Sequence, residues 1–361
     1  MRIVIFGLSV SSAWGNGHAT LWRSLIAALD AAGNDVVFFE RDASYYREHR
    51  DLDRLGGRAR LCLYRSWDDV REEAGRAIAA CDAAIVTSYC PDARPAAERV
   101  LSSRALRVFY DLDTPITLSR LDAGEDVAYL PPGGLGGFDL VLSYTGGQAL
   151  ALLRDRLGAR RVAPLYGSVD PLHHYPVAAE AHWRAACSYL GTWSPDRQDA
   201  LETLFLEPAR RRPGRFLIGG PQYPAEAAWP ANVARIEHVA PPQHPAFYCS
   251  SPLTISVTRA PMAALGFCPS ARLFEAAACG VPVLSDRWPG LETFFAPGAE
   301  ILVADSTDSA LDAIELGPEA LARIGRRARA RVLADHSSTQ RAAELIGFLE
   351  GEAPRVAGGW S

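Results

Sequence analysis

The chain has 361 residues, of which 48% are hydrophobic, and its formal net charge is −5. All 37 residues counted as lysine or arginine are arginine. Chemistry that requires a lysine amine, such as a Schiff base or a Walker-A phosphate loop, is therefore excluded. The net negative charge argues against nucleic acid as a main partner, because proteins that bind it usually carry a basic surface.

The chain is longer than the ~250–300 residues at which a single core stops growing, so two domains are expected. The seven cysteines contain no C-x-x-C pair, and their odd number favours free thiols over disulfides and gives no zinc pattern. The first apolar run is too short for a signal peptide, and no run reaches the ~18 apolar residues that span a bilayer. The sequence predicts a cytoplasmic protein without integral membrane contact.

The first half alternates short β-rich runs with amphipathic helices, which is the pattern of a parallel sheet covered by helices. A helix is expected at 20–29, where the apolar positions share one face and Gly33 follows as a stop signal. These features predict a Rossmann-like opening. Its strands are expected at 3–7, 35–39, 83–88, 106–110, 139–143 and 162–166.

A second series with the same architecture follows the Pro- and His-containing stretch 171–176. Its strands are expected at 188–190, 215–219, 254–257, 281–285 and 300–303, and its clearest helices at 271–279 and 317–334. The predicted fold is α/β, with two Rossmann-like domains whose parallel sheets face a central cleft. The expected domains are 1–175 and 176–337, with a final helical segment, 338–361, that crosses back to the first domain.

The strongest local signal is the segment 266–283. Ser270 is expected to cap a helix whose free N–H groups can bind an anion. Arg272 lies in the first turn of this helix, and Glu275 follows on the same face one turn deeper. A cation for a diphosphate and a carboxylate for ribose hydroxyls are what a nucleotide-sugar pocket requires. The alternative is that Ser270 only caps, and that Arg272 and Glu275 form a surface pair worth roughly a few tenths of a kcal/mol.

Several further segments occur in an order that resembles GT-B glycosyltransferases, in particular the CgeB-like (spore maturation protein CgeB-like) family. The resemblance extends over most of the chain. Several motifs in the order typical of the family identify it more specifically than any single motif does. The segments are 109–115, 164–170 with Tyr175-Pro176, 189–198, 257–259, 266–283 and 285–292.

The resemblance implies roles for residues of the second domain. Glu275 would bind the ribose of the donor nucleotide, and Arg272 and Arg197 would hold its diphosphate. Arginine can take the place that lysine has in many relatives, because a guanidinium binds phosphate with two parallel hydrogen bonds. Without the family context, Arg197 could equally be a surface residue paired with Asp196 or Glu202. The remaining donor-binding candidates are Gly17, Gly191, Thr192, Arg259, Ser270 and Ala271.

One position departs from the family pattern. Many retaining GT-B enzymes carry a glutamate eight residues before the ribose glutamate, and this chain has Phe267 there. Retention of the anomeric configuration is implied by the resemblance, but the usual carboxylate contact to the transferred sugar is missing. Among later carboxylates, Glu292 is preferred to Asp286 as the group at the donor-sugar end.

The catalytic candidates of the first domain follow its strands. Gly17 and His18 lie in a glycine-containing turn, where His18 could bind the donor or act as a base, or could simply start a helix. Asp111 and Asp113 could orient the acceptor or the sugar, although Asp-x-Asp-Thr-Pro is also good turn chemistry. Segment 143–147 is expected on the acceptor side, and 40–75 is a candidate lid. Trp193, Trp288 and Tyr166 could stack on a base or sugar, or belong to the core.

The sequence thus predicts a glycosyltransferase of the hexosyltransferase type that moves a sugar from a nucleotide-sugar donor, most simply a UDP-sugar, to an acceptor hydroxyl. The acceptor could be a small molecule, a glycan or a protein. The reaction is expected to be retaining, metal-independent and without a cofactor other than the donor, and a homodimer is compatible with the sequence. The alternatives are a nucleotide-sugar 2-epimerase and a catalytically silent sugar-binding module.

Overall fold

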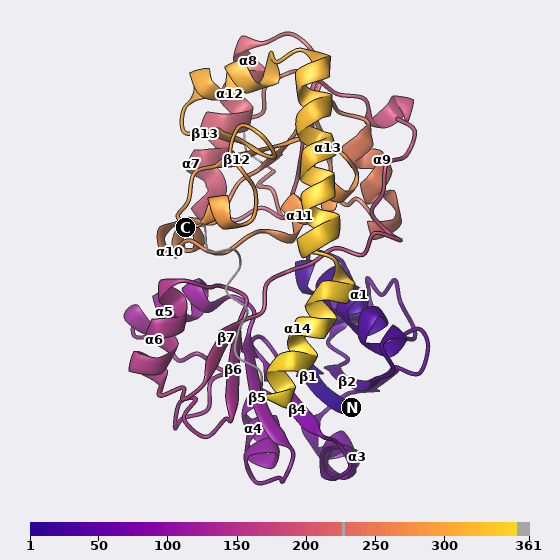
Figure 1. Ribbon diagram of the computed structural model, residues 1–361, viewed down its shortest axis with the longest axis vertical. Helices are drawn as coiled ribbons and strands as arrows, with labels where there is room; N and C mark the ends of the chain where they lie inside the picture. The colour runs from indigo at the N-terminus through magenta and orange to yellow at the C-terminus, as the bar shows by residue number, and fades with distance from the viewer. Residues whose placement is uncertain (226–227, 352–361) are drawn as a thin grey trace. The chain divides into compact units, whose positions relative to one another are not determined.

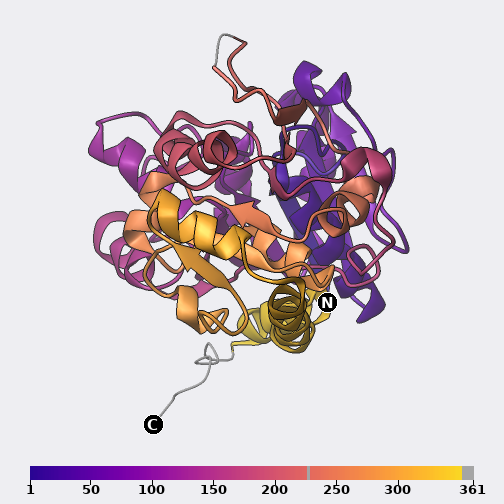
Figure 2. The ribbon, with the colours of Figure 1, turned by 90° about the horizontal axis from the view of Figure 1, so that it is seen from above.

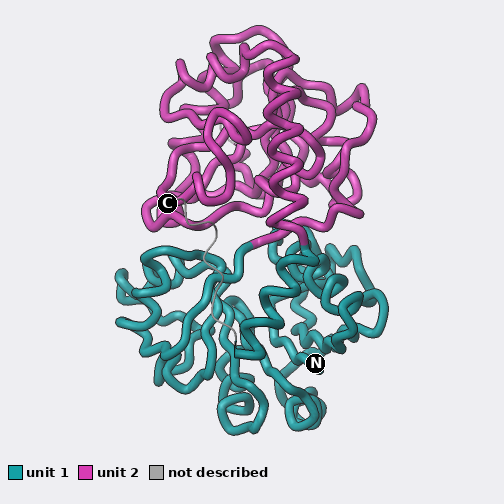
Figure 3. Tube along the Cα trace, in the orientation of Figure 1, with its two compact units in different colours: residues 1–166, 338–361 teal, residues 167–337 magenta. Residues whose placement is uncertain are grey.

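The computed structural model describes residues 1–225 and 228–351. The chain divides into two compact units (Figure 3): Met1–Tyr166 with the segment that begins at Ser338, and Gly167–Ser337. From the sequence, the first domain was expected to end at residue 175. Residues 352–361 of the expected C-terminal segment lie outside the described residues. Each unit contains a parallel sheet with helices (Figure 1), so the predicted α/β class with two Rossmann-like domains is confirmed.

The first unit is built on a seven-stranded sheet in the order β3-β2-β1-β4-β5-β6-β7, in which every neighbouring pair is parallel. Its strands are β1 Arg2–Gly7, β2 Asp35–Arg41, β3 Arg60–Tyr64, β4 Ala83–Thr87, β5 Leu106–Asp111, β6 Leu140–Ser143 and β7 Val162–Pro164. Its helices are α1 Gly17–Ala31, α2 Ser44–Arg47, α3 Trp67–Ala79, α4 Ala93–Leu101, α5 Thr114–Asp122, α6 Gln148–Leu157 and α14 Ser338–Glu350.

Alternation along the central strands gives this sheet two buried faces. Ile3 and Ile5 of β1 pack into a cluster with α1 and α14, whereas Val4 and Phe6 pack into a second cluster with α3 and α4. Successive side chains of a strand point to opposite faces, so a strand that is apolar throughout must be covered on both. Helix α14 lies beside α1 (Figures 1 and 2), and its Leu345 is fully buried.

The second unit has a six-stranded parallel sheet in the order β10-β9-β8-β11-β12-β13. Its strands are β8 Cys187–Leu190, β9 Phe216–Gly219, β10 Val233–Ile236, β11 Thr254–Ser256, β12 Val283–Asp286 and β13 Leu302–Ala304. Its α-helices are α7 Gln198–Leu201, α8 Glu207–Arg211, α9 His244–Cys249, α10 Ala260–Leu265, α11 Ala271–Ala278, α12 Thr307–Ile314 and α13 Pro318–Asp335. Five short helical segments complete it: η1 Ala181–Trp183, η2 Pro195–Arg197, the π-helical η3 Glu202–Leu206, η4 Pro241–Gln243 and η5 Leu291–Thr293.

Two strands, β3 and β10, were not expected from the sequence. Both lie at the edge of their sheets, and their residues are largely half-buried. The segment 40–75, which was expected as a lid, therefore contributes a strand of the first sheet. Among the described residues, no helix is both long and apolar enough to span a membrane.

Truncating Leu345 tests the packing of α14. Because this side chain is fully buried in the same cluster as α1, Leu345→Ala should lower the free energy of unfolding by about 2–5 kcal/mol. The matched control is Leu316→Ala, whose side chain is exposed and should cost less than about 0.5 kcal/mol. Urea unfolding followed by circular dichroism measures both, and equal losses would contradict a buried α14.

Candidate functional site

Both sheets reverse their strand order between two central strands. In the first unit the reversal lies between β1 and β4, and in the second between β8 and β11. At such a switch point the helices that follow the two strands leave on opposite faces, so the carboxyl ends of the strands border a crevice where ligands bind. Most of the predicted site residues follow one of these four strands or the neighbouring β5.

Arg272, at the start of α11, joins the two strand ends of the second switch point. Its Nη1 donates to the Leu190 carbonyl at the end of β8, over 2.6 Å, and its Nη2 to the Val257 carbonyl after β11, over 3.4 Å. Its Nε donates to the Ser270 hydroxyl, over 3.0 Å. Gly191 permits this arrangement, because a Cβ there would lie 2.3 Å from Arg272 Nη1.

Arg197 and Arg259 follow β8 and β11 respectively. Arg197 Nη1 donates to the Thr192 carbonyl, and its buried Nε has no hydrogen-bond partner in the described part of the chain. Burial lowers the pKa of Arg197, and the nearby Arg272 and Arg259 lower it further. Asp196 does not pair with Arg197, because it binds Arg259 at 2.8 Å. Among the described residues, only Arg259 of these three arginines is therefore paired with a carboxylate.

The start of α11 keeps its backbone donors free of side-chain caps. Ser270 is the N-cap residue, but no side-chain cap bond forms, because its hydroxyl accepts from Arg272 instead. The Leu273 N–H donates to the Ser270 carbonyl over 3.0 Å, so the N–H groups of Ala271 and Arg272 are the ones available to an anion. The alternative in which Arg272 and Glu275 form a surface ion pair does not occur, since Glu275 is 6% exposed and Arg272 is bound to carbonyls.

Glu275 lies in a pocket of polar side chains that the sequence did not predict. The Tyr248 hydroxyl donates to Glu275 Oε2 over 3.1 Å, and His244 Nδ1 lies 3.8 Å from the same oxygen. His174 completes the group, with its ligand atoms and those of His244 and Glu275 all within 4.8 Å of one another. Burial lowers the pKa of His174 to about 4, so its ring is neutral at neutral pH.

The two later carboxylates, Asp286 and Glu292, lie in different environments. Asp286 accepts hydrogen bonds from the Thr258 N–H and hydroxyl, each over 2.9 Å, and burial raises its pKa. Glu292 is exposed in the short segment η5. Phe267, at the position where many relatives carry a glutamate, has a φ of 48°. Such a φ is strained for an aromatic residue and marks a local constraint.

In the first unit a buried carboxylate fixes the loop that leads to His18. Glu40 accepts four hydrogen bonds from that loop, from the Ser9 and Ser11 hydroxyls and from the Val10 and Ser11 N–H groups. Asn16 then caps α1, its side chain accepting from the His18 N–H, and Gly17 is the first helical residue. This loop holds the His18 ring at the carboxyl end of β1.

His18 lies beside Asp113, with Nε2 3.8 Å from Oδ2. Burial lowers the pKa of His18, although the Asp113 charge acts in the opposite direction. Tyr89, which follows β4, stacks obliquely on His18 with ring centroids 5.7 Å apart, and it has a φ of 62°. Tyr89 was not predicted from the sequence, because nothing in its neighbours signals a strained tyrosine at a strand end.

Asp111 supports the same group from the end of β5. Its Oδ1 accepts from the Thr117 hydroxyl over 3.1 Å and from the Asp113 N–H over 3.2 Å. The first unit thus gathers a histidine, two carboxylates and a strained tyrosine at its switch point. Segment 143–147 is nearby in the sheet, where the Ser143 hydroxyl hydrogen-bonds Thr114 at 2.7 Å.

The three candidate aromatic residues have other contacts. Trp288 is buried near Phe294, Trp193 donates to the Gln198 side chain over 3.3 Å, and the Arg341 guanidinium lies over the Tyr166 ring.

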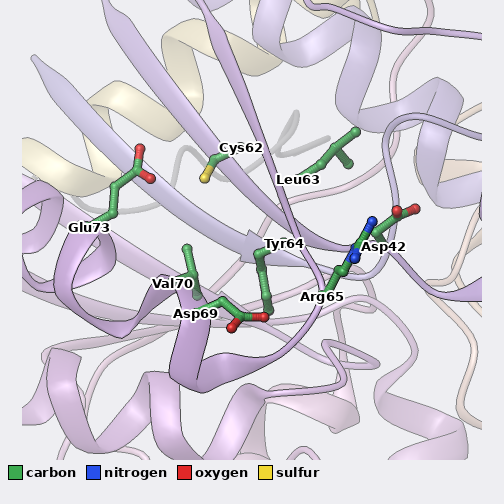
Figure 4. A pocket seen from close by; sticks show the side chains of 8 residues that line it. All are labelled: Asp42, Cys62, Leu63, Tyr64, Arg65, Asp69, Val70 and Glu73. Atoms are coloured by element: carbon green, nitrogen blue, oxygen red, sulfur yellow. The ribbon is translucent and has the colours of Figure 1, made fainter.

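A cavity of about 320 Å³ beside β3 and α3 contains none of the predicted site residues (Figure 4). Three of its carboxylates already have partners: Asp42 binds Arg50, Asp69 caps α3 with Ser66, and Glu73 binds Arg60. Its lining residues are Asp42, Cys62, Leu63, Tyr64, Arg65, Asp69, Val70 and Glu73.

Asp111 should give the stability of the protein a measurable pH dependence. Burial raises its pKa to about 6, so the folded chain binds this proton more tightly than the unfolded chain. Its stabilising contribution is complete below about pH 4 and is lost as the pH rises through about 6. Relative to Asp111→Asn, which mimics the neutral acid, the wild type should lose roughly 2–3 kcal/mol between about pH 4 and pH 8.

Urea unfolding of both proteins at the two pH values measures this difference. Asp53→Asn is the control, because Asp53 is exposed. Its substitution should leave the change in the free energy of unfolding between the two pH values nearly the same as in the wild type. If the free energies of unfolding of the wild type and Asp111→Asn differed by the same amount at both pH values, this would contradict the raised pKa of Asp111.

Residues 197–347 match the model of a protein family described as Glycosyl transferase-like. This match includes Arg197, Arg259, Ser270, Arg272 and Glu275. No curated protein sequence matches the chain.

Solved structures with the same fold cover both units of the chain. A sucrose-phosphate synthase from Thermosynechococcus elongatus superposes with a TM-score of 0.70 at 16% identity, over 97% of this chain and 98% of its own. Anabaena HepE in complex with UDP and glucose gives 0.65 at 14% identity, over 97% and 100%. An E. coli trehalose-6-phosphate structure bound with UDP-2-fluoro glucose gives 0.63 at 13%, over 98% and 100%. The family match and the fold together indicate a glycosyltransferase of the GT-B type.

Proposed function

We propose that this protein transfers a sugar from a UDP-sugar to an acceptor hydroxyl, and that the donor binds at the switch point of the second unit. The observation that carries the proposal is the group of three guanidiniums around β8 and β11, of which, among the described residues, only Arg259 is paired with a carboxylate. An excess of partly buried positive charge is costly unless an anion compensates it. A nucleoside diphosphate carries that anion.

In this proposal Arg197 and Arg272 stabilise the diphosphate as it leaves the sugar. Charge accumulates on the leaving group in the transition state, so fixed cations and N–H groups aimed at it accelerate the reaction. The uncapped N–H groups at the start of α11 and the unpartnered Nε of Arg197 are donors of this kind. Arginine supplies the positive charge, and the transfer is therefore proposed to require no metal cofactor.

Glu275 is proposed to accept hydrogen bonds from the ribose hydroxyls of the donor. It is one turn deeper in α11 than Arg272, which is the order in which a ribose follows a diphosphate. The uridine base is proposed because the structures of HepE and of the E. coli relative contain UDP or a UDP-sugar.

The first unit is proposed to carry the acceptor chemistry. A neutral His18 with Asp113 3.8 Å from its Nε2 can accept a proton from a hydroxyl, and the carboxylate then stabilises the imidazolium. Asp111 and Tyr89 are proposed to position this pair. We expect transfer with retention of configuration, as the resemblance implies, and the anomeric coupling in the NMR spectrum of the product tests this expectation.

Donor binding gives the first test. In a thermal-shift panel of UDP, GDP, dTDP and CDP, UDP should raise the melting temperature most. Arg197→Gln should weaken UDP binding by about 10–100-fold in calorimetry, because it removes a charge-assisted hydrogen bond worth roughly 1.5–3 kcal/mol. The matched control is Arg323→Gln, which removes an exposed guanidinium of the same unit and should leave UDP affinity unchanged.

Two outcomes would contradict the proposal. Equal UDP affinity for the wild type and Arg197→Gln would show that the donor does not bind at the switch point of the second unit. Conversion of UDP-N-acetylglucosamine to an epimer without any acceptor would favour an epimerase. Hydrolysis of a UDP-sugar above background would instead count against a catalytically silent module.

A further inference from the structure

The group formed by His174, His244 and Glu275 has properties that donor binding alone does not explain. His174 follows the start of the second unit, His244 begins α9, and Glu275 lies in α11. Each offers one ligand atom, and these atoms lie within 4.8 Å of one another. Three segments distant in sequence thus converge on one point.

One hydrogen bond around this point fixes the orientation of His244. His244 Nε2 lies 3.1 Å from the Val239 carbonyl, and because a carbonyl can only accept, Nε2 carries a proton. The other ring nitrogen, Nδ1, is buried, has no hydrogen-bond partner in the described chain, and faces Glu275 Oε2 at 3.8 Å. A cation between these two atoms would bind both of them.

His174 adds a third ligand atom without a partner. It is 7% exposed, and neither of its ring nitrogens has a hydrogen-bond partner within residues 1–225 and 228–351. Buried polar groups without partners are rare and call for a ligand or a functional role. Glu275 is also without a guanidinium partner in the described chain.

We propose that His174, His244 and Glu275 bind a divalent first-row transition-metal ion, for which Zn²⁺ is the probe. Two imidazoles and one carboxylate suit such an ion. The surroundings also fit, since metal-binding histidines usually donate their other N–H to a carbonyl and ligating carboxylates are themselves hydrogen-bonded. His244 does the first through Val239, and Tyr248 provides the second for Glu275. Ligand bonds of about 2.0–2.2 Å would draw these atoms closer together than their present spacing of up to 4.8 Å.

The ion and the nucleotide-sugar donor would compete, because both use Glu275. This consequence rests on the proposed function, whereas metal binding itself does not. The metal is therefore an inhibitory ligand of the donor site rather than a cofactor of the transfer. It was not expected from the sequence, because the two histidines are separated by 70 positions and lack a metal-binding spacing.

The test uses the full chain without a histidine tag, first with Co²⁺ and then with Zn²⁺. Co²⁺ should bind at one site, with d–d absorption bands and no thiolate charge-transfer band, and Zn²⁺ should displace it. His174→Phe keeps the ring volume without a ligand atom, and His244→Gln retains the Nε donor for Val239. Each should weaken Co²⁺ binding at least about ten-fold, while His173→Ala, which removes the exposed neighbouring imidazole, should not.

Unchanged Co²⁺ affinity in both folded variants would overturn the proposal, and so would a thiolate charge-transfer band, which would assign the metal to the cysteines. Circular dichroism establishes that each variant is folded. UDP calorimetry with and without Zn²⁺ is measured separately, and Zn²⁺ should weaken UDP binding in the wild type but not in His174→Phe. Metal binding without any UDP binding would contradict the proposed function and leave the metal site standing.

Discussion

The second unit depends on the hydrogen bonds of one guanidinium group. Arg272 binds the carbonyls of Leu190 and Val257, and it thereby ties together the strand ends between which the sheet reverses its order. The same residue lies in the first turn of α11, so Glu275 is positioned by the contacts that hold Arg272. The structural and the proposed ligand-binding roles of this arginine therefore cannot be separated, because the site is part of the connection between strand and helix.

The two units place opposite chemistry at the same topological position. The second has an excess of guanidinium groups after β8 and β11, whereas the first collects His18, Asp111 and Asp113 after β1 and β5. Each arrangement opposes folding, since the pKa of Arg197 is lowered and that of Asp111 raised by burial. Structures retain such groups where a ligand or a reaction requires them. A cationic site suits a diphosphate, and an acid–base group suits a hydroxyl.

Much of the fold could be predicted because buried parallel strands are apolar throughout. The edge strands β3 and β10 were missed: each has a neighbouring strand on one side only, and Arg235 interrupts the apolar pattern of β10. Within the candidate site, Arg272 and Glu275 could be proposed because a helix start fixes their spacing and the segment resembles the donor-binding motif of a known family. His174, His244 and Tyr89 could not, because their contacts depend on where loops from separate parts of the chain end.

The absence of lysine bears directly on this site. Arg272 uses three nitrogens for three partners, two carbonyls and the Ser270 hydroxyl, and it still carries its full charge next to the start of α11. A lysine ammonium has three donors on one atom and could not reach strand ends on both sides of the switch point together with that hydroxyl. At this position arginine is therefore a geometric requirement, whatever removed lysine from the rest of the chain. Arg197 differs, because one hydrogen bond to Thr192 makes few geometric demands and its charge is the property that a bound diphosphate would need.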